Sequence, residues 1–319
     1  MALTKEQIKE FKETEKEAED SYDFRSVADD IADAGDKEWA KKVYGKTESK
    51  AEDCSDFRDL ADSIHKNLGD KDWAKELYKK AEGKAEDCSN FSNLADSIHE
   101  NLGDKDWAKE LYKKAEGKAE DCSDFYRLAN SIFKNLGDKE WATRLYKKAE
   151  EKAEDSDNLC SLGDSIHENL GDNDWAKKIY EKAEEKAEEV SHFCDVAEGI
   201  CENLGDKEWA LKIYKKVVDN IENSTFLKLD EEWWDDFYCL ANRIYETLRD
   251  TELLKIIYTK WEKKSKDIYH FCALADGIHE KLGDKEWAKK MYEKALELAE
   301  KNENKDEISK IKEKLEECR

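Results

Sequence analysis

Apolar residues recur along this chain at the three-and-four spacing that places them on one face of an α-helix. In the segment 51–84 one stripe runs through a first predicted helix and another through the helix that follows. The pair Gly69-Asp70 separates them, because Gly accepts the left-handed conformation that ends a helix and Asp caps the next one. Neither helix can bury its stripe alone, so neighbouring hairpins must stack. The stripes are Phe57, Leu60, Ala61, Ile64 and Leu68, then Trp73, Ala74, Leu77, Tyr78, Ala81 and Ala85.

The same hairpin occurs eight times, and six Trp-Ala pairs recur at a fixed interval of 34 residues. A period in this range is typical of a stacked helical array. Arrays of this kind bind other macromolecules far more often than they catalyse reactions. We therefore predict an all-α fold. The six Trp residues are Trp39, Trp73, Trp107, Trp141, Trp175 and Trp209.

The residue classes within each hairpin follow a fixed order. They are Phe57-x2-Leu60-Ala61-x2-Ile64 on the first helix and Ala74-x3-Tyr78-x2-Ala81 on the second. This order resembles the tetratricopeptide repeat, and the Ala-x2-Leu-Tyr-x2-Ala segment is also similar to the related Sel-type repeats. Most copies depart from the family by one extra residue before the Gly, by the Trp before the Ala, and by the absence of a closing Pro. The resemblance implies a right-handed α-solenoid of about eight helix-turn-helix repeats, whose first helices line a concave groove where ligands dock.

The seventh repeat is aberrant. Leu253 replaces its Trp, Arg249 replaces its Gly, and an insertion near 219–234 contains Phe226, Trp233 and Trp234. We predict that the paired Trp residues pack inside an irregular repeat, with a binding face as the alternative. The expected domains are an N-terminal helix at 1–20, a solenoid at 21–298 and a capping helix at 299–319. The repeats within the solenoid lie near 21–50, 51–84, 85–118, 119–152, 153–186, 187–220, 231–264 and 265–298.

Charge and aromatic content narrow the class of protein. A charged fraction of 43% would suggest disorder, but 10 Trp, 13 Tyr and 10 Phe recur at regular positions, and no Pro interrupts a helix. The net charge of −24 disfavours phosphate backbones and anionic membranes and favours a basic partner. The alternative is that the acidic residues form solvated faces, balanced by Lys at helical spacing.

The chain has nine cysteines, and their spacing bears on whether they form disulfides. Cys54, Cys88 and Cys122 lie one repeat apart, which is too far for a disulfide. We therefore expect reduced thiols in a cytoplasm. The chain begins with no apolar leader-like stretch, and no segment approaches the length of a transmembrane helix.

Sequence variation between repeats concentrates on the first helix. The segments 51–84 and 85–118 differ at four positions, all on the first helix and off its apolar stripe. In the next copy, 119–152, the same surface changes again. We interpret this surface as the one that selects a ligand, with neutral drift as the alternative. The four differences are Asp56/Asn90, Arg58/Ser92, Asp59/Asn93 and Lys66/Glu100.

Two polar columns run along the first helices. An acid and a His at i, i+3, such as Asp62 and His65, share a helix face and form a half-site for a divalent metal. Phe133 and Tyr245 interrupt the His column, so we predict no metal site and favour a polar ladder that is either structural or ligand-facing. A second use of the acid column is to receive Lys or Arg from a partner. The predicted groove residues are Arg58, Asp59, Asp62, His65, Asp96, His99, Tyr126, Arg127, Asn130, Phe133, Asp164, His167, Glu198, Asn242, Tyr245, Asp276 and His279.

No motif indicates catalysis. The chain has no Gly-rich phosphate loop, His-Glu pairs lack a second His at metalloprotease spacing, and no repeat stands out as a unique active site. We predict a non-catalytic scaffold without a cofactor, which binds a basic protein or peptide in an acidic concave groove. One form of it is an immunity or antitoxin protein that inhibits a toxic effector. The alternatives are a nucleic-acid mimic that occupies a DNA-binding protein, an adaptor or chaperone of a secretion or signalling complex, and a metal-binding sensor.

Overall fold

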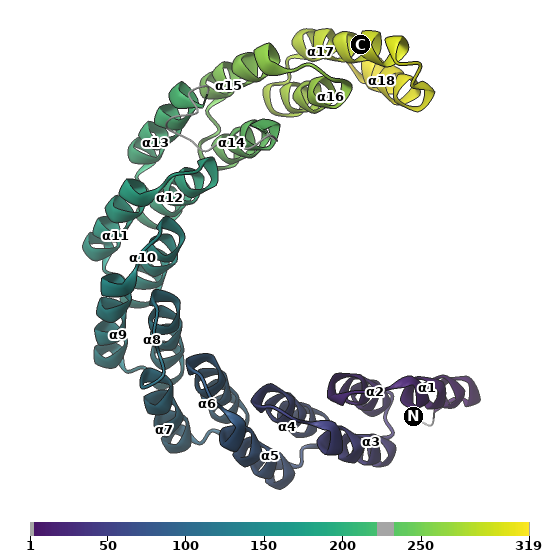
Figure 1. Ribbon diagram of the computed structural model, residues 1–319, viewed down its shortest axis with the longest axis vertical. Helices are drawn as coiled ribbons and strands as arrows, with labels where there is room; N and C mark the ends of the chain where they lie inside the picture. Colours follow the sequence, from purple (N-terminus) through teal and green to yellow (C-terminus); the bar gives the residue numbers. More distant parts are fainter. Residues whose placement is uncertain (1–2, 222–232, 319) are drawn as a thin grey trace. The chain divides into compact units, whose positions relative to one another are not determined.

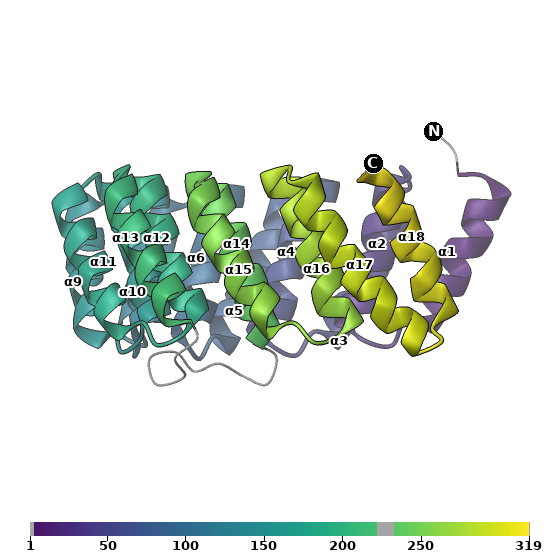
Figure 2. The ribbon, with the colours of Figure 1, turned by 90° about the horizontal axis from the view of Figure 1, so that it is seen from above.

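The computed structural model describes residues 3–221 and 233–318. Over these residues the secondary structure is helical, with no strand, which confirms the prediction of an all-α fold. The chain forms two compact units, Met1–Ala153 and Glu154–Arg319. Each unit is a solenoid-like stack of consecutive helix pairs (Figures 1 and 2).

In the first unit a single helix precedes four helix pairs. Within each pair the first helix packs against the second, and it also contacts the first helix of the following pair. First helices therefore form one layer and second helices the other (Figure 1). The bounds are α1 Lys5–Glu17, α2 Ser21–Asp33, α3 Lys37–Lys50, α4 Cys54–Leu68, α5 Lys71–Lys84, α6 Cys88–Leu102, α7 Lys105–Glu116, α8 Cys122–Leu136 and α9 Lys139–Lys152.

The second unit has the same two layers and ends in an additional helix, α18, which packs on α17 and buries Ile311. Phe226 and the side chain of Trp233 lie outside the described residues, whereas Trp234 is half-buried near the start of α14. The bounds are α10 Ser156–Leu170, α11 Asn173–Lys186, α12 Val190–Leu204, α13 Lys207–Asn220, α14 Trp233–Leu248, α15 Thr251–Lys264, α16 Ile268–Gly277, the π-helical segment η1 Ile278–Leu282, α17 Lys285–Lys301 and α18 Lys305–Glu317.

The Gly-Asp turns define where helices end and begin. Gly69 takes a φ of 72°, and the side chain of Asp70 accepts a hydrogen bond of 3.2 Å from the backbone N–H of Trp73. Arg249 adopts the same left-handed region at φ 56° although it is not Gly. Asp residues cap most of the other described helices in the same way, so part of the net negative charge serves helix initiation.

The predicted apolar stripes form the core. Phe57, Leu60, Ala61 and Ile64 of α4 are buried, as are Ala74, Leu77, Tyr78 and Ala81 of α5. Leu68, Trp73 and Ala85 are only half-buried, which differs from the prediction. Trp73 is half-buried, and its indole Nε1 donates a hydrogen bond of 3.0 Å to Glu48 of α3, the second helix of the preceding repeat.

Candidate functional site

All the predicted groove residues lie on first helices. Apart from Arg127, which is exposed, each of them is half-buried. They are Arg58, Asp59, Asp62 and His65 on α4, Asp96 and His99 on α6, Tyr126, Arg127, Asn130 and Phe133 on α8, Asp164 and His167 on α10, Glu198 on α12, Asn242 and Tyr245 on α14, Asp276 on α16 and His279 on η1.

The acid column joins successive repeats. Asp62 accepts a hydrogen bond of 2.5 Å from the hydroxyl of Tyr78 in its own repeat. It also accepts bonds of 3.1 Å from Ser97 and 2.9 Å from Asn101, both in the next repeat. Asp29 and Asp96 make the same set of contacts, and Asp164 makes the contacts to Tyr and Asn. We call this arrangement the Tyr–Asp–Asn tie.

Burial sets the protonation behaviour of the tie. It raises the pKa of Asp62, Asp96 and Asp164, although the hydrogen bonds from the tyrosines oppose that effect. Burial likewise raises the pKa of Tyr78, so its hydroxyl remains a donor. These carboxylates thus connect successive repeats through side-chain hydrogen bonds.

Other members of the acid column have different partners. Asn130 accepts a hydrogen bond of 2.6 Å from the Tyr146 hydroxyl. Asp276 accepts one of 2.5 Å from Tyr292 and forms an ion pair of 3.2 Å with Lys314. This variety shows that the position tolerates an amide where the tyrosine donor is kept.

The histidines of the second column make few contacts in common. His167 Nδ1 lies 2.9 Å from the side-chain oxygen of Asn173, whereas His99 Nδ1 is buried and has no hydrogen-bond partner among the described residues. Within residues 3–221 and 233–318, no three His, Cys, Asp or Glu side chains are placed so that they could hold a metal ion. The half-site formed by Asp62 and His65 therefore gains no further ligand there.

Several predicted aromatic and basic residues already contact each other. The guanidinium of Arg127 lies 5.8 Å from the ring centre of Tyr126, and Arg58 pairs with Asp59 at 2.7 Å. The Arg249 guanidinium lies 4.2 Å from the ring centre of Tyr245, and the Lys281 ammonium group lies 5.2 Å from the same ring centre. The faces of these rings are occupied by cations of the chain itself.

An acidic pocket of 340 Å³ opens between α10 and α12. It brings together the predicted residues Asp164 and Glu198, and no Lys or Arg lines it. Burial raises the pKa of Glu198, and Arg243 of α14 pairs with both Glu198 and Asp195, the latter at 2.8 Å. The carboxylates of this acidic pocket are Asp157, Asp164, Glu168, Asp195, Glu198 and Glu202.

The sequence analysis missed Asp157, Glu168, Asp195 and Glu202. Glu168 and Glu202 are exposed, and neither forms an ion pair with another described residue. Each lies four positions after a residue of the acid column, so it occupies the same helix face one turn later. That spacing could have identified Glu168 and Glu202 from the sequence.

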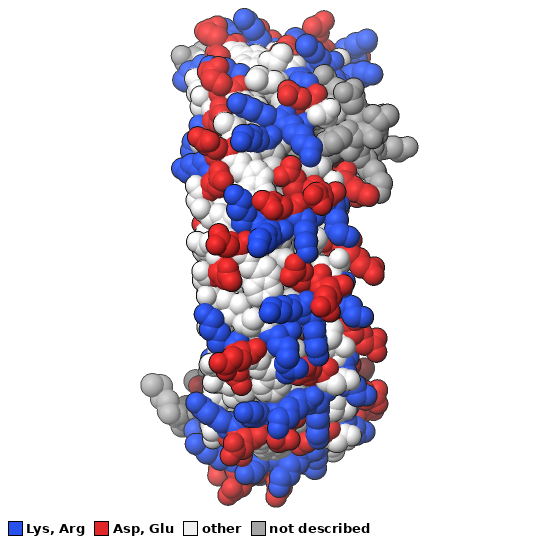
Figure 3. Space-filling view, turned by 90° about the vertical axis from the view of Figure 1, so that its left-hand side faces the viewer, with Lys and Arg blue, Asp and Glu red and all other residues white. Residues whose placement is uncertain are grey.

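The two layers of helices differ in charge. Helices α10 and α12 each carry three acidic residues and no Lys or Arg, and α6 carries two acidic residues and neither basic type. Helix α5, in contrast, carries five Lys against three acidic residues. On the side of the molecule where second helices such as α11 and α13 lie, bands of Lys and Arg alternate with Asp and Glu (Figure 3). Among these helices, acidic residues without Lys or Arg are found on the first helices α6, α10 and α12.

Comparisons with known proteins found a matching family model and similar solved structures. The tetratricopeptide repeat family model matches residues 272–302, which confirms the resemblance inferred from the sequence. Similar solved structures include yeast Tom70, with 18% identity over 93% of this chain and 59% of that one at a TM-score of 0.38. Another is the C-terminal part of a tetratricopeptide repeat-containing protein from Cytophaga hutchinsonii, with 16% identity over 89% of this chain and 98% of that one at a TM-score of 0.31. This chain thus spans less than two thirds of the Tom70 chain, and no curated protein matches it in sequence.

Two further observations concern the environment of the protein. In the part of the chain that the structure describes, no helix is both long enough and apolar enough to cross a membrane. The nine cysteines are free thiols.

Proposed function

We propose that this chain is a non-catalytic scaffold that binds a basic protein or peptide on the face formed by its first helices. The tetratricopeptide-like fold is typical of protein–protein interaction scaffolds. The observation that carries the basic character of the partner is the acidic pocket, whose six carboxylates are accompanied by no lining Lys or Arg. The free thiols agree with a reducing cytoplasm as its location.

Binding would relieve an electrostatic cost within this pocket. Burial raises the pKa of Asp164 and Glu198, which means that their charged forms are disfavoured in the free protein. An incoming ammonium or guanidinium group stabilises the charged carboxylates and forms charge-assisted hydrogen bonds with them. Glu168 and Glu202, at the exposed edge, would attract the cation first.

The partner would contact the exposed acids more than the Tyr–Asp–Asn tie. The oxygens of Asp62 and Asp96 are engaged with residues of two repeats, so charge reversal there would disturb folding as well as binding. Glu168 and Glu202 make no such contacts and can be changed with little structural effect. They are therefore the residues to test.

The experiment measures the affinity of a fluorescein-labelled oligolysine peptide by fluorescence anisotropy. The double variant Glu168→Lys/Glu202→Lys should bind on the order of 10-fold more weakly than the wild type. The double variant Glu181→Lys/Glu185→Lys is the matched control, because it changes the net charge equally at exposed positions of α11, a second helix. Equal losses in both variants would show that only net charge matters and would refute the proposed face.

A toxic effector with a basic surface would be a suitable partner for such a scaffold, and an immunity-type inhibitor is the specific form that we propose. A nucleic-acid mimic would instead need a continuous acidic surface. Arg58 and Lys66 on α4, and Arg127 and Lys134 on α8, interrupt the acidic residues of the first helices, which favours the scaffold over the mimic.

A further inference from the structure

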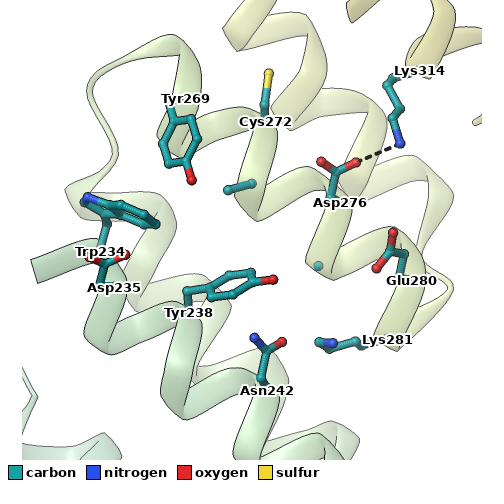
Figure 4. A pocket seen from close by; sticks show the side chains of 12 residues that line it. Trp234, Asp235, Tyr238, Asn242, Tyr269, Cys272, Asp276, Glu280, Lys281 and Lys314 are labelled. Carbon is teal, nitrogen blue, oxygen red and sulfur yellow. Dashed lines mark ion pairs between the residues drawn. The ribbon is translucent and has the colours of Figure 1, made fainter. Parts of the chain in front are cut away.

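A second pocket, of 470 Å³, lies between α14 and α16 in the aberrant part of the second unit. Trp234, Tyr238 and Tyr269 line one end of it, and Glu280, Lys281 and Lys314 lie at the other (Figure 4). We call it the aromatic pocket. No other described first helix carries Trp at the register of Trp234, so its aromatic end is particular to this place.

The rings form a corner. The ring centres of Trp234 and Tyr269 are 4.9 Å apart and the ring planes meet at 79°. Tyr238 follows Trp234 by four positions on α14, so its ring lies on the same helix face. Tyr238 is 48% exposed and Tyr269 is 58% exposed, and among the described large apolar side chains only that of Tyr22 is more exposed than both. Exposed aromatic rings gathered at a hollow indicate a binding surface.

The charges around the pocket favour a cation at its aromatic end. Asp235 lines that end, is exposed, and forms no ion pair with a described residue. The two lysines at the opposite end already have partners: Lys314 pairs with Asp276 at 3.2 Å, and Lys281 lies over the Tyr245 ring. The carboxylate of Asp235 therefore remains to balance an incoming positive charge.

These three rings differ from two half-buried tyrosines on first helices, Tyr126 and Tyr245. Tyr126 is stacked with Arg127 of its own helix, and Tyr245 is stacked with Arg249, which directly follows α14. No Lys or Arg among the described residues stacks on Trp234, Tyr238 or Tyr269. The quadrupole of an aromatic ring attracts a cation to its face, and this attraction is unused here.

We propose that the aromatic pocket binds the ammonium group of a lysine side chain supplied by the partner. The inference rests on the proposed function, since it assigns one contact of a basic partner. A compact ammonium group can approach the faces of two rings that meet at a right angle, whereas a planar guanidinium favours parallel stacking on one. The alkyl chain would lie along Cys272 and Ala273, which also line the pocket.

The test uses a probe that requires no extended groove. Blocked lysine (Nα-acetyl-lysine methylamide) is titrated into the full chain while the methyl resonance of Ala273 is followed by NMR. Tyr269→Ala and Trp234→Ala should each weaken binding about 2- to 30-fold. Tyr269→Phe, which keeps the ring, should bind as the wild type does. Tyr126→Ala is the matched control, because Tyr126 occupies the register of Tyr238 but stacks with Arg127.

The outcomes separate this inference from the proposed function. Binding of blocked lysine and of its trimethyl form, with loss of binding for the neutral Nζ-acetyl form, supports the aromatic pocket. No shift of Ala273, unchanged affinity in the ring-deleted variants, or tighter binding of blocked arginine overturns it. The oligolysine assay with Glu168→Lys/Glu202→Lys is independent of these rings, so the acidic face can stand when the aromatic pocket fails. Circular dichroism of each variant verifies that it is folded.

Discussion

The hydroxyl of Tyr112 on α7 donates a hydrogen bond of 2.5 Å to Asp96 on α6, and the same carboxylate oxygen accepts a bond of 2.8 Å from Asn135 on α8. Asn135 also donates to the Tyr112 hydroxyl at 2.8 Å. One carboxylate thus connects both helices of its own repeat with the first helix of the next. Because a buried donor or acceptor without a partner is costly, the three side chains depend on one another.

Removal of this carboxylate should destabilise the protein. Asp96→Ala leaves the Tyr112 and Asn135 donors without their acceptor, and we expect a loss of about 3 kcal/mol in the free energy of unfolding. Asp96→Asn should cost less than about 1 kcal/mol, because Asn130 accepts the equivalent bond from Tyr146 in the next repeat. Urea denaturation followed by circular dichroism measures both. Equal costs for the two variants would mean that the tie does not act through this acceptor.

The tie should also make stability depend on pH in a defined direction. Burial raises the pKa of Asp96 in the folded protein above its unfolded value of about 3.9. Ionisation is then harder in the folded state, so stability present below the unfolded pKa is lost as pH rises through the folded pKa. Asp96→Asn lacks this titration. Its cost relative to the wild type should therefore shrink as the pH rises from about 4 through the folded-state pKa of Asp96, as measured by urea denaturation at each pH. A cost that grows over this range would contradict the raised pKa.

The fold could be predicted from the sequence because residues within each repeat determine where its helices begin and end and which helix faces are buried. Phe57, Leu60 and Ile64 define a buried helix face, and Gly69-Asp70 ends one helix and starts another. Spacing alone did not reveal that Trp73 remains half-buried, because a half-buried edge and a buried face have the same helical period.

The candidate site was harder to predict, because it depends on which polar atoms already form hydrogen bonds within the protein. From the sequence alone Asp62 and Glu168 cannot be told apart as candidates, because each is an acidic residue on a predicted first helix. In the folded chain Asp62 is bound to Tyr78, Ser97 and Asn101, whereas Glu168 is exposed at the acidic pocket. Contacts between residues 16 to 39 positions apart determine this difference, and the pattern of a single helix contains no information on them.

In most repeats the unusual Trp has a structural partner that can be tested. Trp107 donates a hydrogen bond of 2.9 Å from Nε1 to Glu82 of the preceding second helix, and Lys114 pairs with the other oxygen of Glu82 at 2.7 Å. We expect Glu82→Ala to lower the free energy of unfolding by about 1 kcal/mol, because the indole N–H loses its acceptor. Glu76→Ala, at an exposed position of the same helix, is the control and should change stability by less than about 0.5 kcal/mol. A similar loss in both variants would show that the Trp–Glu contact contributes nothing specific.

Cys239 on α14 should be the most reactive thiol of the described chain near neutral pH. A hydrogen bond from the buried Cys194 thiol, together with the positive charge of Arg243, lowers the pKa of Cys239 to about 6. Burial instead raises the pKa of Cys272 to about 11, although that thiol is also half-buried, which makes it the internal control. Because the thiolate is the nucleophile, alkylation of Cys239 by iodoacetamide should rise with pH around 6 and then level off, while that of Cys272 stays slow up to about pH 8. Peptide mass spectrometry after timed alkylation measures both rates. Cys194→Ala should move the Cys239 profile to higher pH, and an unmoved profile would rule out the thiol–thiol hydrogen bond as its cause.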